Sequence, residues 1–337
     1  MSKEQLINVF TGKNEDFIPF SVWHHFNPNE HIEATDDDDI LKNDLEKEIN
    51  YVDNINPDFI KLMNDGLFTY DFNGVTNPRD IDDLKNIKPI NDNDKWLKKQ
   101  TDLITKQLEK IGKDKLVLSN VFSAVTLFKW KLVEDTPEKD LAEADHLFAN
   151  LYIENPEVIL NALKTINQDI KKQIKTEKSA GVDGVLFSTQ EIQDDRITKE
   201  FFDTVQKPLD LELVDEINHQ FDVSILHICG FDEAKSHLPW FTDYNLPVVN
   251  WSTSTDDYTL GEGKKLFKDK VVFGGLGNTT NDVLFKGSKE EIEDEINSIL
   301  DEAGTDRVII GADCTVPRET PFEHIKWAND AVHNYKN

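Results

Sequence analysis

The chain has 337 residues, of which 65 are Asp or Glu and 37 are Lys or Arg, so its formal net charge at neutral pH is −28. Such an acidic protein repels nucleic-acid phosphates and anionic lipid headgroups, which argues against both kinds of partner. Apolar residues make up 38 % of the chain, which is enough for a sizeable core. The length allows two ordinary domains or one large α/β barrel.

The sequence contains no apolar run long enough to span a membrane, and its N-terminus has no signal-peptide pattern. Only two cysteines are present, Cys229 and Cys314, and these are too few for a disulfide framework. We therefore expect a reduced, cytoplasmic protein that acts on a small molecule.

Short apolar stretches that are rich in β-branched residues recur along the whole chain. Their length is that of strands, and their continuous apolar character is typical of parallel strands buried on both faces. The eight predicted strands are Ile18–Trp23, Asp58–Met63, Lys115–Phe122, Val182–Ser188, Val223–Cys229, Leu246–Trp251, Lys270–Gly275 and Arg307–Asp313.

The segments between these strands carry apolar residues at helical spacing. Ser288 and Glu291 form the pattern of a capping box at one helix start, and Gly304 stands where that helix should end. Pro321 suits the first turn of the last helix. The acidic stretch 35–39 is expected to be a solvated loop near a helix start. The predicted helices are Asp92–Ile111, Pro156–Ala180, Lys199–Phe221, Ser288–Ala303 and Pro321–Tyr335.

Strands and helices alternate throughout the chain without a change of composition. This order predicts an α/β fold, a single (β/α)8 TIM barrel that forms one domain over residues 1–337. An open, doubly wound sheet is the rival, but no GxGxxG motif follows an early strand. In a TIM barrel the reactive groups lie at the C-terminal ends of the strands.

Chemically capable side chains gather at these predicted strand ends. His227 and Cys229 are two residues apart on the fifth strand, so their side chains should leave the same face. Cys314 follows the eighth strand and should meet them across a narrow barrel. One imidazole and two thiolates suit Zn²⁺, whose catalytic sites have three protein ligands and an open position. Gln190 and Glu191 are candidates for a weak fourth ligand.

A plainer interpretation of these residues stays open. Isolated buried cysteines are usually inert packing groups, and His227 would then be a hydrogen-bonded core residue.

His24 and His25 end the first strand as candidate catalytic residues, although only one of two adjacent side chains can point into a barrel. Asp65 is either an anchor for a substrate nitrogen or a turn residue before Gly66.

Further residues at the same strand ends are candidates for the wall of a substrate site. The two tryptophans would form an apolar surface, whereas the polar residues at the end of the fourth strand would contact the substrate. These candidates are Trp23, Ser188, Gln190 and Trp251.

Several of these segments resemble the uroporphyrinogen decarboxylase superfamily. The segment 226–230, LHICG, matches the family's His-x-Cys-Gly, and the segment 64–67, NDGL, resembles its aspartate turn. The Gly-Asn pair at 277–278 and the closing stretch 311–321 are similar too, so the resemblance covers nearly the whole chain. It implies the barrel fold, and in a decarboxylase it implies that Asp65 engages pyrrole N–H groups.

Two branches of the superfamily differ at informative positions. The decarboxylases carry an arginine-bearing segment after the first strand and a histidine near the end of the eighth, whereas this chain has no arginine within 22–30 and has Cys314. The chain is closer to the zinc-dependent methylcobamide:coenzyme M methyltransferases, and this resemblance implies that His227, Cys229 and Cys314 hold Zn²⁺. That branch usually has glycine where this chain has Asp313.

The resulting hypothesis is zinc-dependent transfer of a methyl group from a corrinoid or another methylated donor to a thiol, with His24 or His25 positioning the acceptor. A corrinoid protein is a candidate partner, and the family resemblance implies a monomer or a homodimer. Two alternatives are a cofactor-free decarboxylase of uroporphyrinogen or a smaller carboxylated substrate, and a non-catalytic corrinoid-binding protein.

Overall fold

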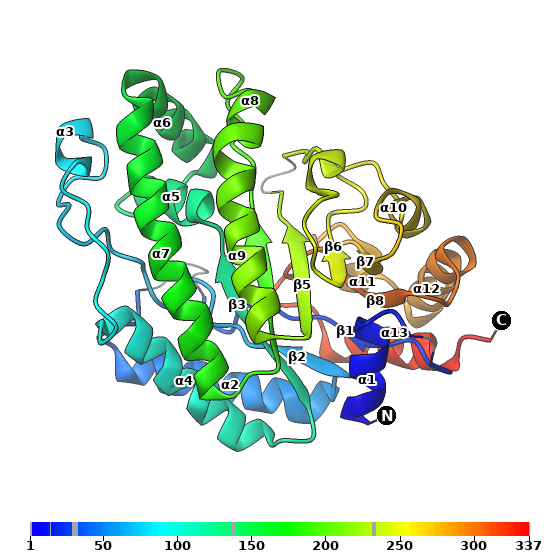
Figure 1. The fold of residues 1–337 in the computed structure, drawn as a ribbon. Coiled ribbons are helices and arrows are strands. Elements are labelled where there is room, and N and C mark those ends of the chain that lie inside the picture. The colour runs from blue at the N-terminus through cyan, green and yellow to red at the C-terminus, as the bar shows by residue number, and fades with distance from the viewer. Residues whose placement is uncertain (1, 14, 29–32, 137–138, 231–233, 337) are drawn as a thin grey trace.

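The computed structural model describes residues 2–13, 15–28, 33–136, 139–230 and 234–336, and its eight strands form one parallel sheet curled into a barrel (Figure 1). The hydrogen-bonded order is β1-β8-β7-β6-β5-β4-β3-β2. Across the remaining seam, the N–H of Asp58 donates to the Phe20 carbonyl at 3.1 Å, and Ser21 Oγ donates to the Phe59 carbonyl at 2.8 Å. The predicted (β/α)8 barrel is confirmed.

The observed strands coincide with the predicted ones to within a few residues. The strands β1, β2 and β6 are shorter than predicted, and β1 and β2 lie at the seam. There the Asp58 carboxylate, at 2.7 Å, accepts the N–H of Phe20 in place of a ladder carbonyl. The strands are β1 (Phe20–Ser21), β2 (Phe59–Lys61), β3 (Leu116–Phe122), β4 (Gly184–Thr189), β5 (Val223–Ile228), β6 (Val248–Asn250), β7 (Val271–Leu276) and β8 (Val308–Ala312).

Helices surround the barrel, and five of them correspond to predicted ones. The predicted helix Lys199–Phe221 is interrupted by a π-helical turn, because Pro208 has no N–H for the regular ladder and the wider turn accommodates its ring. The matching segments are α4 (Lys95–Ile111), α7 (Pro156–Ala180), α8 (Lys199–Phe201) with η1 (Phe202–Gln206) and α9 (Lys207–Gln220), α12 (Lys289–Ala303) and α13 (Phe322–Asn334).

Other helices were not predicted. Helix α5 is apolar around nearly its whole circumference because it packs between other elements, so its sequence shows no helical period. The acidic stretch 35–39 leads into α2, where Asp37 caps the N-terminus by accepting the N–H groups of Asp39 and Ile40. These helices are α1 (Lys3–Phe10), α2 (Asp38–Ile55), α3 (Ile81–Leu84), α5 (Ala124–Val133), α6 (Leu141–Glu154), η2 (Leu238–Phe241), α10 (Leu260–Leu266) and α11 (Val283–Lys286).

The cap residues behave largely as the sequence indicates. The Ser288 side chain accepts from the N–H of Glu291, the Glu291 carboxylate accepts from the N–H of Ser288, and α12 ends at Gly304 with φ +72°. Pro321 precedes the first residue of α13 as its N-cap and does not lie within the first turn.

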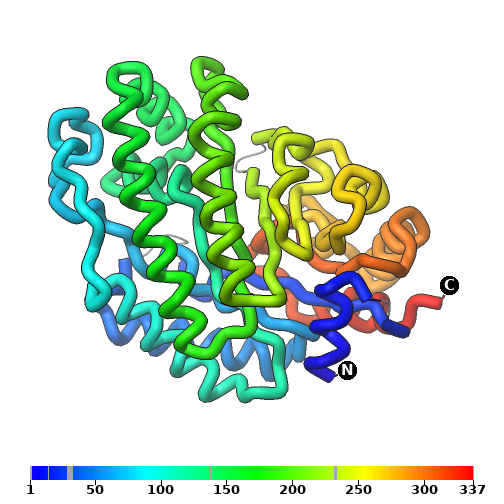
Figure 2. Tube along the Cα trace, viewed as in Figure 1, coloured from blue at the N-terminus to red at the C-terminus, as the bar shows by residue number. Residues whose placement is uncertain are grey.

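The two ends of the chain meet at the N-terminal end of the barrel. Figure 2 shows the first segment, in blue, beside the last segments, in red. The ring of Phe10 from α1 packs edge-on against Phe59 at 5.1 Å and closes this end of the barrel. His333 of α13 pairs with Asp58 at 2.9 Å. This end is therefore sealed, and the strands open to solvent at their C-terminal ends.

Aromatic rings fill the barrel interior. Phe273 of β7 reaches Phe59 of β2 and Trp23, with ring centroids 5.6 Å away in both cases. Gly311 makes this possible, because a Cβ at that position would lie 2.4 Å from the Phe273 ring. The rings form a solid floor beneath the mouth of the barrel.

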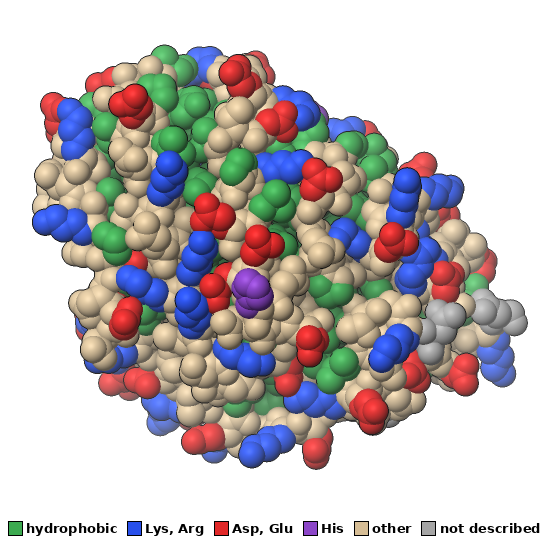
Figure 3. All heavy atoms as spheres, viewed as in Figure 1, with side chains coloured by type: hydrophobic (Ala, Val, Ile, Leu, Met, Phe, Trp, Pro, Cys, Tyr) green, Lys and Arg blue, Asp and Glu red, His purple; other side chains and the backbone are tan. Residues whose placement is uncertain are grey.

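Acidic and basic side chains are interspersed over the face that Figure 3 shows. Within the described parts of the chain, none of the helices combines the length and the apolar character that crossing a bilayer requires.

Asp44 and Glu48 lie one turn apart on α2, and each is only 1 % exposed. Burial raises the pKa of Asp44 to about 8 and that of Glu48 to about 7. The folded protein therefore keeps protons that the unfolded chain loses above pH 4. This contribution to the free energy of unfolding is present at low pH and disappears as the pH rises through 7 to 8.

We expect Asp44→Asn to flatten this dependence, because the substituted residue has no proton to lose. Urea denaturation between pH 6 and 9 should show a smaller fall in the free energy of unfolding for Asp44→Asn than for the native chain. The exposed Asp53→Asn change on the same helix serves as the control and should leave the slope unchanged. An unchanged slope in Asp44→Asn would show that this carboxyl is already ionised.

Candidate metal centre at the barrel mouth

The strand register places Ser188, His227 and Asn250 side by side across β4, β5 and β6. His227 pairs with Ser188 on one side and with Asn250 on the other. Asn250 pairs in turn with Phe273, whose ring contacts Phe59 inside the barrel. Because paired residues of parallel strands point to the same face, this row faces the barrel interior.

Two cysteines join His227 at the mouth. Cys229 lies just beyond β5, and its N–H still donates to the Thr189 carbonyl at 2.9 Å, so its side chain leaves the same face as His227. Cys314 comes from the turn after β8, and its Sγ is 3.5 Å from His227 Nε2. The ligand atoms of all three residues lie within 4.8 Å of one another, and both thiols are free. The structure thus brings together the trio that the sequence singled out.

Asn250 orients the imidazole of His227. Its Nδ2 donates to the carbonyls of Phe273, at 2.9 Å, and Ala312, at 3.4 Å, so its Oδ1 faces His227 Nδ1 at 2.5 Å. Because Oδ1 can only accept, Nδ1 carries a proton. The other nitrogen, Nε2, faces Cys314. A metal-binding histidine is typically held in this way by a partner on its second nitrogen.

Asp313 anchors the turn that carries Cys314. One carboxylate oxygen accepts the N–H and the hydroxyl of Thr253, both at 2.7 Å, and the other accepts the N–H of Gly275 at 2.8 Å. Burial raises the pKa of Asp313 to about 7. The turn after β8 is therefore tied to the loops after β6 and β7, and this fixes where the Cys314 sulfur lies.

The side chains of His227, Cys229 and Cys314 alter one another's pKa. The hydrogen bond between the thiols holds the pKa of Cys314 well below its usual value and raises the pKa of Cys229 well above it. Burial acts to lower the pKa of His227, but the interactions with Cys314 and the hydrogen bond to Asn250 together outweigh burial, so the pKa of His227 is raised. The pocket thus favours a protonated imidazole at His227 beside a deprotonated sulfur at Cys314. A bound metal cation would replace that proton, since metal ligands must be deprotonated.

The two candidates for a fourth ligand, Gln190 and Glu191, have different hydrogen-bond partners. Gln190 Nε2 donates to the sulfur of Cys229 at 3.5 Å, and its Oε1 is buried without a hydrogen-bond partner among the described residues. Glu191 turns to His237, whose N–H and Nδ1 contact its two oxygens at 2.6 and 2.8 Å. Gln190 therefore lies beside the cluster of His227, Cys229 and Cys314, whereas both carboxylate oxygens of Glu191 are engaged elsewhere.

Just after β1, Trp23 faces the barrel interior and His24 faces outward, which continues the alternation of the strand. Trp23 packs against Phe273, whereas the His24 ring sits in an aromatic cluster beneath α2 and α13 and its Nδ1 lies 2.8 Å from the His25 carbonyl. Burial lowers the pKa of His24. The cluster around His24 consists of Phe26, Tyr51 and Phe322. The structure does not bring His24 to His227, Cys229 and Cys314, and the next residue, His25, is half-buried.

Trp251 also points away from the mouth. It directly follows the inward-facing Asn250, so its side chain enters the helix layer. There its Nε1 donates to the Tyr258 carbonyl at 2.9 Å, and its ring packs against Phe267 and over Gly263 of α10. Trp251 is therefore a core residue, and of the two tryptophans only Trp23 faces the barrel interior.

A buried ion pair stands inside the barrel near the metal cluster. Lys61 of β2 is 2 % exposed, and its Nζ lies 2.5 Å from Asp65 Oδ2 and 3.1 Å from Met63 Sδ. The ammonium also sits 5.8 Å above the Trp23 ring. The second oxygen of Asp65, Oδ1, is buried without a hydrogen-bond partner in the described part of the chain.

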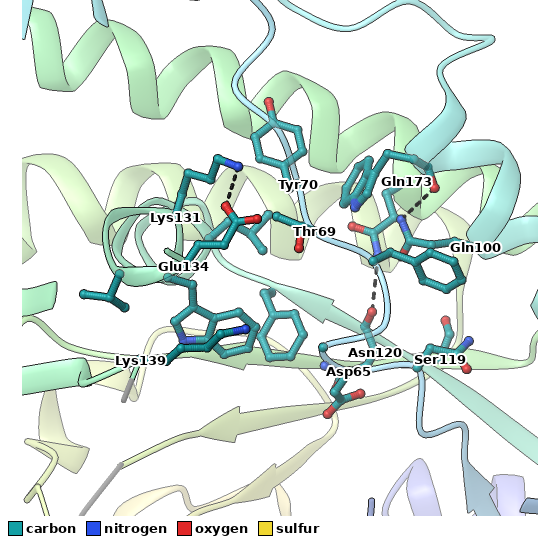
Figure 4. A pocket seen from close by; sticks show the side chains of 18 of the residues that line it. Asp65, Thr69, Tyr70, Gln100, Ser119, Asn120, Lys131, Glu134, Lys139 and Gln173 are labelled. Carbon is teal, nitrogen blue, oxygen red and sulfur yellow. Dashed lines mark hydrogen bonds and ion pairs between the residues drawn. The ribbon is translucent and has the colours of Figure 1, made fainter. Parts of the chain in front are cut away.

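A cavity of about 80 Å³ opens beside Asp65 (Figure 4). It lies between the loop after β2, the end of β3, and the helices α4, α5 and α7. Phe122 of its wall pairs with Ser188, which pairs with His227, so the cavity wall is two strands, or about 10 Å, from the cluster. Its aromatic residues are Phe68, Tyr70, Trp96, Phe122 and Trp130, and its amides are Asn64, Gln100, Asn120 and Gln173.

Sequence reasoning assigned no role to Lys61, Asn250 or Asp313. Each is a polar residue within or directly after an apolar strand segment. In a strand buried on both faces such a residue must find a partner, so a signal was present. The partner itself depends on which strands are neighbours and on their register, and the local sequence shows neither.

The family model for uroporphyrinogen decarboxylase (URO-D) matches residues 72–335, which is most of the chain. This chain belongs to the uroporphyrinogen decarboxylase family. The resemblance drawn from the sequence is therefore confirmed at the level of the superfamily. No curated protein matches the chain.

Solved structures support the fold assignment of this URO-D family member. A methyltransferase from Methanosarcina mazei is 15 % identical, with a TM-score of 0.70 over 98 % of this chain and 97 % of that chain. A putative vitamin-B12 independent methionine synthase from Listeria monocytogenes is 14 % identical, with a TM-score of 0.59 over 94 % of this chain and 98 % of that chain. At these identities the likeness concerns the fold, and both neighbours are named as enzymes.

Asn250→Leu should weaken metal binding, because the imidazole of His227 loses the acceptor that fixes its orientation. We expect the Kd for Zn²⁺, measured by competition with a chromophoric chelator, to rise about 10–100-fold. Asn250→Asp keeps an acceptor for Nδ1–H and should lose less affinity.

The matched control is Asn167→Leu, which removes another buried amide, one that donates to the Leu209 carbonyl far from the cluster. Equal zinc affinity in Asn250→Leu and Asn167→Leu would rule out an orienting role for Asn250.

Proposed function

We propose that this URO-D family protein is a zinc-dependent methyltransferase that moves a methyl group from a corrinoid or another methylated donor to a thiol. The observation that carries this proposal is the convergence of His227, Cys229 and Cys314, whose ligand atoms lie within 4.8 Å of one another on the open side of the barrel. The fold shared with a protein named as a methyltransferase supports it.

The clustered residues fit zinc better than they fit a harder cation. Two sulfurs and one imidazole nitrogen form a borderline-soft ligand set of the kind that catalytic zinc sites use with one open position. His227 presents Nε2, because Asn250 occupies Nδ1. Gln190 Oε1, which has no hydrogen-bond partner among the residues that the structure describes, belongs to the amide beside Cys229 and offers a weak contact that a substrate can displace.

When bound, zinc would supply the positive charge that converts an acceptor thiol into a nucleophilic thiolate. Cys229 and Cys314 contribute negative charge of their own, which keeps the acceptor sulfur electron-rich. The acceptor sulfur then forms a bond to the methyl carbon as the bond from that carbon to the donor breaks, and the bonding pair leaves with the donor. The thiol proton passes to solvent.

Other residues of the mouth would shape the reaction. Trp23 presents an apolar face inside the barrel, and Ser188 stands next to His227 in the row. Asp65 and His25 are our candidates for contacts with the substrate, whereas His24 is enclosed by aromatic rings. If the donor is a corrinoid, a separate corrinoid protein would deliver it to the open end of the barrel.

A cofactor-free decarboxylase is the second candidate, and the family match together with one geometric feature favours it. Asp65 Oδ1 is buried without a partner among the described residues, and it lines the cavity. In a decarboxylase this oxygen would accept a ring N–H and stabilise positive charge on the ring. Such a reaction needs no metal, so metal content separates the two candidates.

We expect protein purified without added metal to contain about one equivalent of zinc per chain, measured by inductively coupled plasma mass spectrometry. Cys229→Ser and Cys314→Ser should each lose most of it, because a hydroxyl is a poor ligand beside a thiolate. Glu191→Gln is the control and should keep its zinc, since the Glu191 carboxylate is engaged by His237. Full zinc content in a variant lacking both cysteines would refute the site.

Methyl transfer itself can be followed with methylcobalamin as donor and a panel of small thiols as acceptors. The absorbance change of the corrinoid should depend on protein, thiol and zinc together, and Cys314→Ser should lower the rate at least 100-fold. Release of carbon dioxide from uroporphyrinogen by metal-free protein, with no methyl transfer, would favour the second candidate instead.

A further inference from the structure

The cavity beside the barrel mouth contains a buried amide that the protein leaves unpaired. Asn120 is 7 % exposed, and neither its Nδ2 nor its Oδ1 has a hydrogen-bond partner among the described residues. It lies two residues before Phe122 on β3, so both side chains take the inner face that Ser188 and His227 share. An unpaired buried amide destabilises a protein, and a ligand that supplies one donor and one acceptor removes that penalty.

Asp65 adds a second acceptor at the edge of the same cavity. Its Oδ2 is held by Lys61, whereas its Oδ1 is buried and unpartnered within the described part of the chain. Asn120 thus offers a ligand in this cavity one donor and one acceptor, and Asp65 offers a further acceptor. The lining also includes Lys131, Lys139 and Trp130.

Several other polar groups of the lining are already engaged with each other. Gln173 donates to Gln100 at 3.1 Å and to Glu177 at 2.7 Å, and Ser119 donates to Glu177 at 2.5 Å (Figure 4 shows Gln100, Ser119 and Gln173). Tyr70 donates to Asp169 at 2.7 Å. These bonds make the cavity wall rigid, and they concentrate recognition on Asn120 and Asp65.

The apolar part of the cavity is formed by flat rings from four different elements. Tyr70, from the loop after β2, packs edge-on against Trp96 of α4 at 5.0 Å. Phe122 of β3 packs against Trp130 of α5 at 4.4 Å. Ring surfaces of this kind favour a planar aromatic ligand. The volume of about 80 Å³ is several times the 10–15 Å³ that a single water needs, and the cavity is partly open to solvent.

We propose that this cavity binds a planar nitrogen heterocycle that carries a ring N–H next to a ring carbonyl, the lactam edge of a purinone or pyrimidinone. The carbonyl accepts from Asn120 Nδ2, the N–H donates to Asn120 Oδ1, and a further N–H donates to Asp65 Oδ1. The carboxylates of Asp65 and Glu134 in the lining are paired with Lys61 and Lys131, so these groups add no net charge to the cavity, which suits a neutral ligand.

The proposal rests on the proposed function in one respect, which is that the heterocycle is the non-reacting part of the substrate. The cavity wall is about 10 Å from the cluster of His227, Cys229 and Cys314, so a substrate of this length would reach from the ring pocket to the metal. Binding of the ring itself needs no metal.

The test compares hypoxanthine and uracil with their lactam-free counterparts, purine and pyrimidine. Binding is followed by quenching of tryptophan fluorescence, since Trp96 and Trp130 line the cavity, and by the shift in Tm. We expect the two lactams to bind at least tenfold more tightly than their counterparts. Equal affinity of lactam and lactam-free rings, or no binding of either, would overturn the proposal.

Two substitutions assign the contact to Asn120. Asn120→Leu keeps the number and branching of the side-chain heavy atoms and removes both polar atoms, so it should abolish lactam binding while its Tm without ligand stays equal or rises. Asn120→Asp keeps the acceptor and loses the donor, so it should bind the lactams with intermediate affinity. Asn167→Leu, a buried amide outside the cavity, is the control and should bind them as the native chain does. Unchanged binding in Asn120→Leu would overturn the proposal.

The same titrations in Cys229→Ser and Cys314→Ser separate this inference from the proposed function. Retained lactam binding in these variants supports a ring pocket that is independent of the metal. Absence of zinc from the native chain would remove the methyltransferase proposal and leave the ring pocket standing, whereas loss of lactam selectivity in a zinc-loaded chain would remove only the ring pocket.

Discussion

The pairing of His227 with Asn250 across β5 and β6 is the contact on which the geometry of the barrel mouth depends. The side chain of Asn250 donates to the carbonyls of Phe273 in β7 and Ala312 in β8, and it accepts from the imidazole of His227 in β5. The orientation of that imidazole therefore depends on the positions of β7 and β8. A single amide thus links four strands. Both the NH2 group and the oxygen of the Asn250 amide are hydrogen-bonded, so the amide has a single orientation. This orientation determines which imidazole nitrogen of His227 faces the sulfur of Cys314.

Buried charges are unusually prominent around this mouth. Lys61 pairs with Asp65 inside the barrel, and Lys129 of α5 pairs with Asp145 of α6 at 2.6 Å with both side chains at most 2 % exposed. The positive charge of Lys129 also acts to lower the pKa of Cys229. Such pairs are costly to desolvate, so they contribute little net stability. In each pair the charge of the lysine is balanced by a carboxylate, so the pairs place opposite charges side by side close to the mouth.

The metal cluster and the neighbouring cavity are built from different parts of the barrel. The cluster depends on β5, β6 and the turn after β8, whereas the cavity depends on β2, β3 and the helices beside them. Phe122 and Ser188 connect the two regions through the ladder. In a TIM barrel, loops at one end can vary while the strands keep their register. In our proposals the reacting groups and the ring-binding groups would therefore be carried by separate strands of the same barrel.

The sequence by itself determined the eight strands, five of the helical segments and the closed barrel, because apolar runs and helical periods are local signals that repeat in order. It did not indicate α2, α5 or α6. The sequence also indicated His227, Cys229 and Cys314, because the C-terminal end of each predicted strand can be located in the sequence and reactive groups of TIM barrels lie at those ends. Only the tertiary structure decided that Trp251 and His24 point outward, that Glu191 turns to His237, and that Asn250 holds the imidazole. Those outcomes depend on strand register and on contacts between residues distant in sequence, and no local pattern encodes either of them.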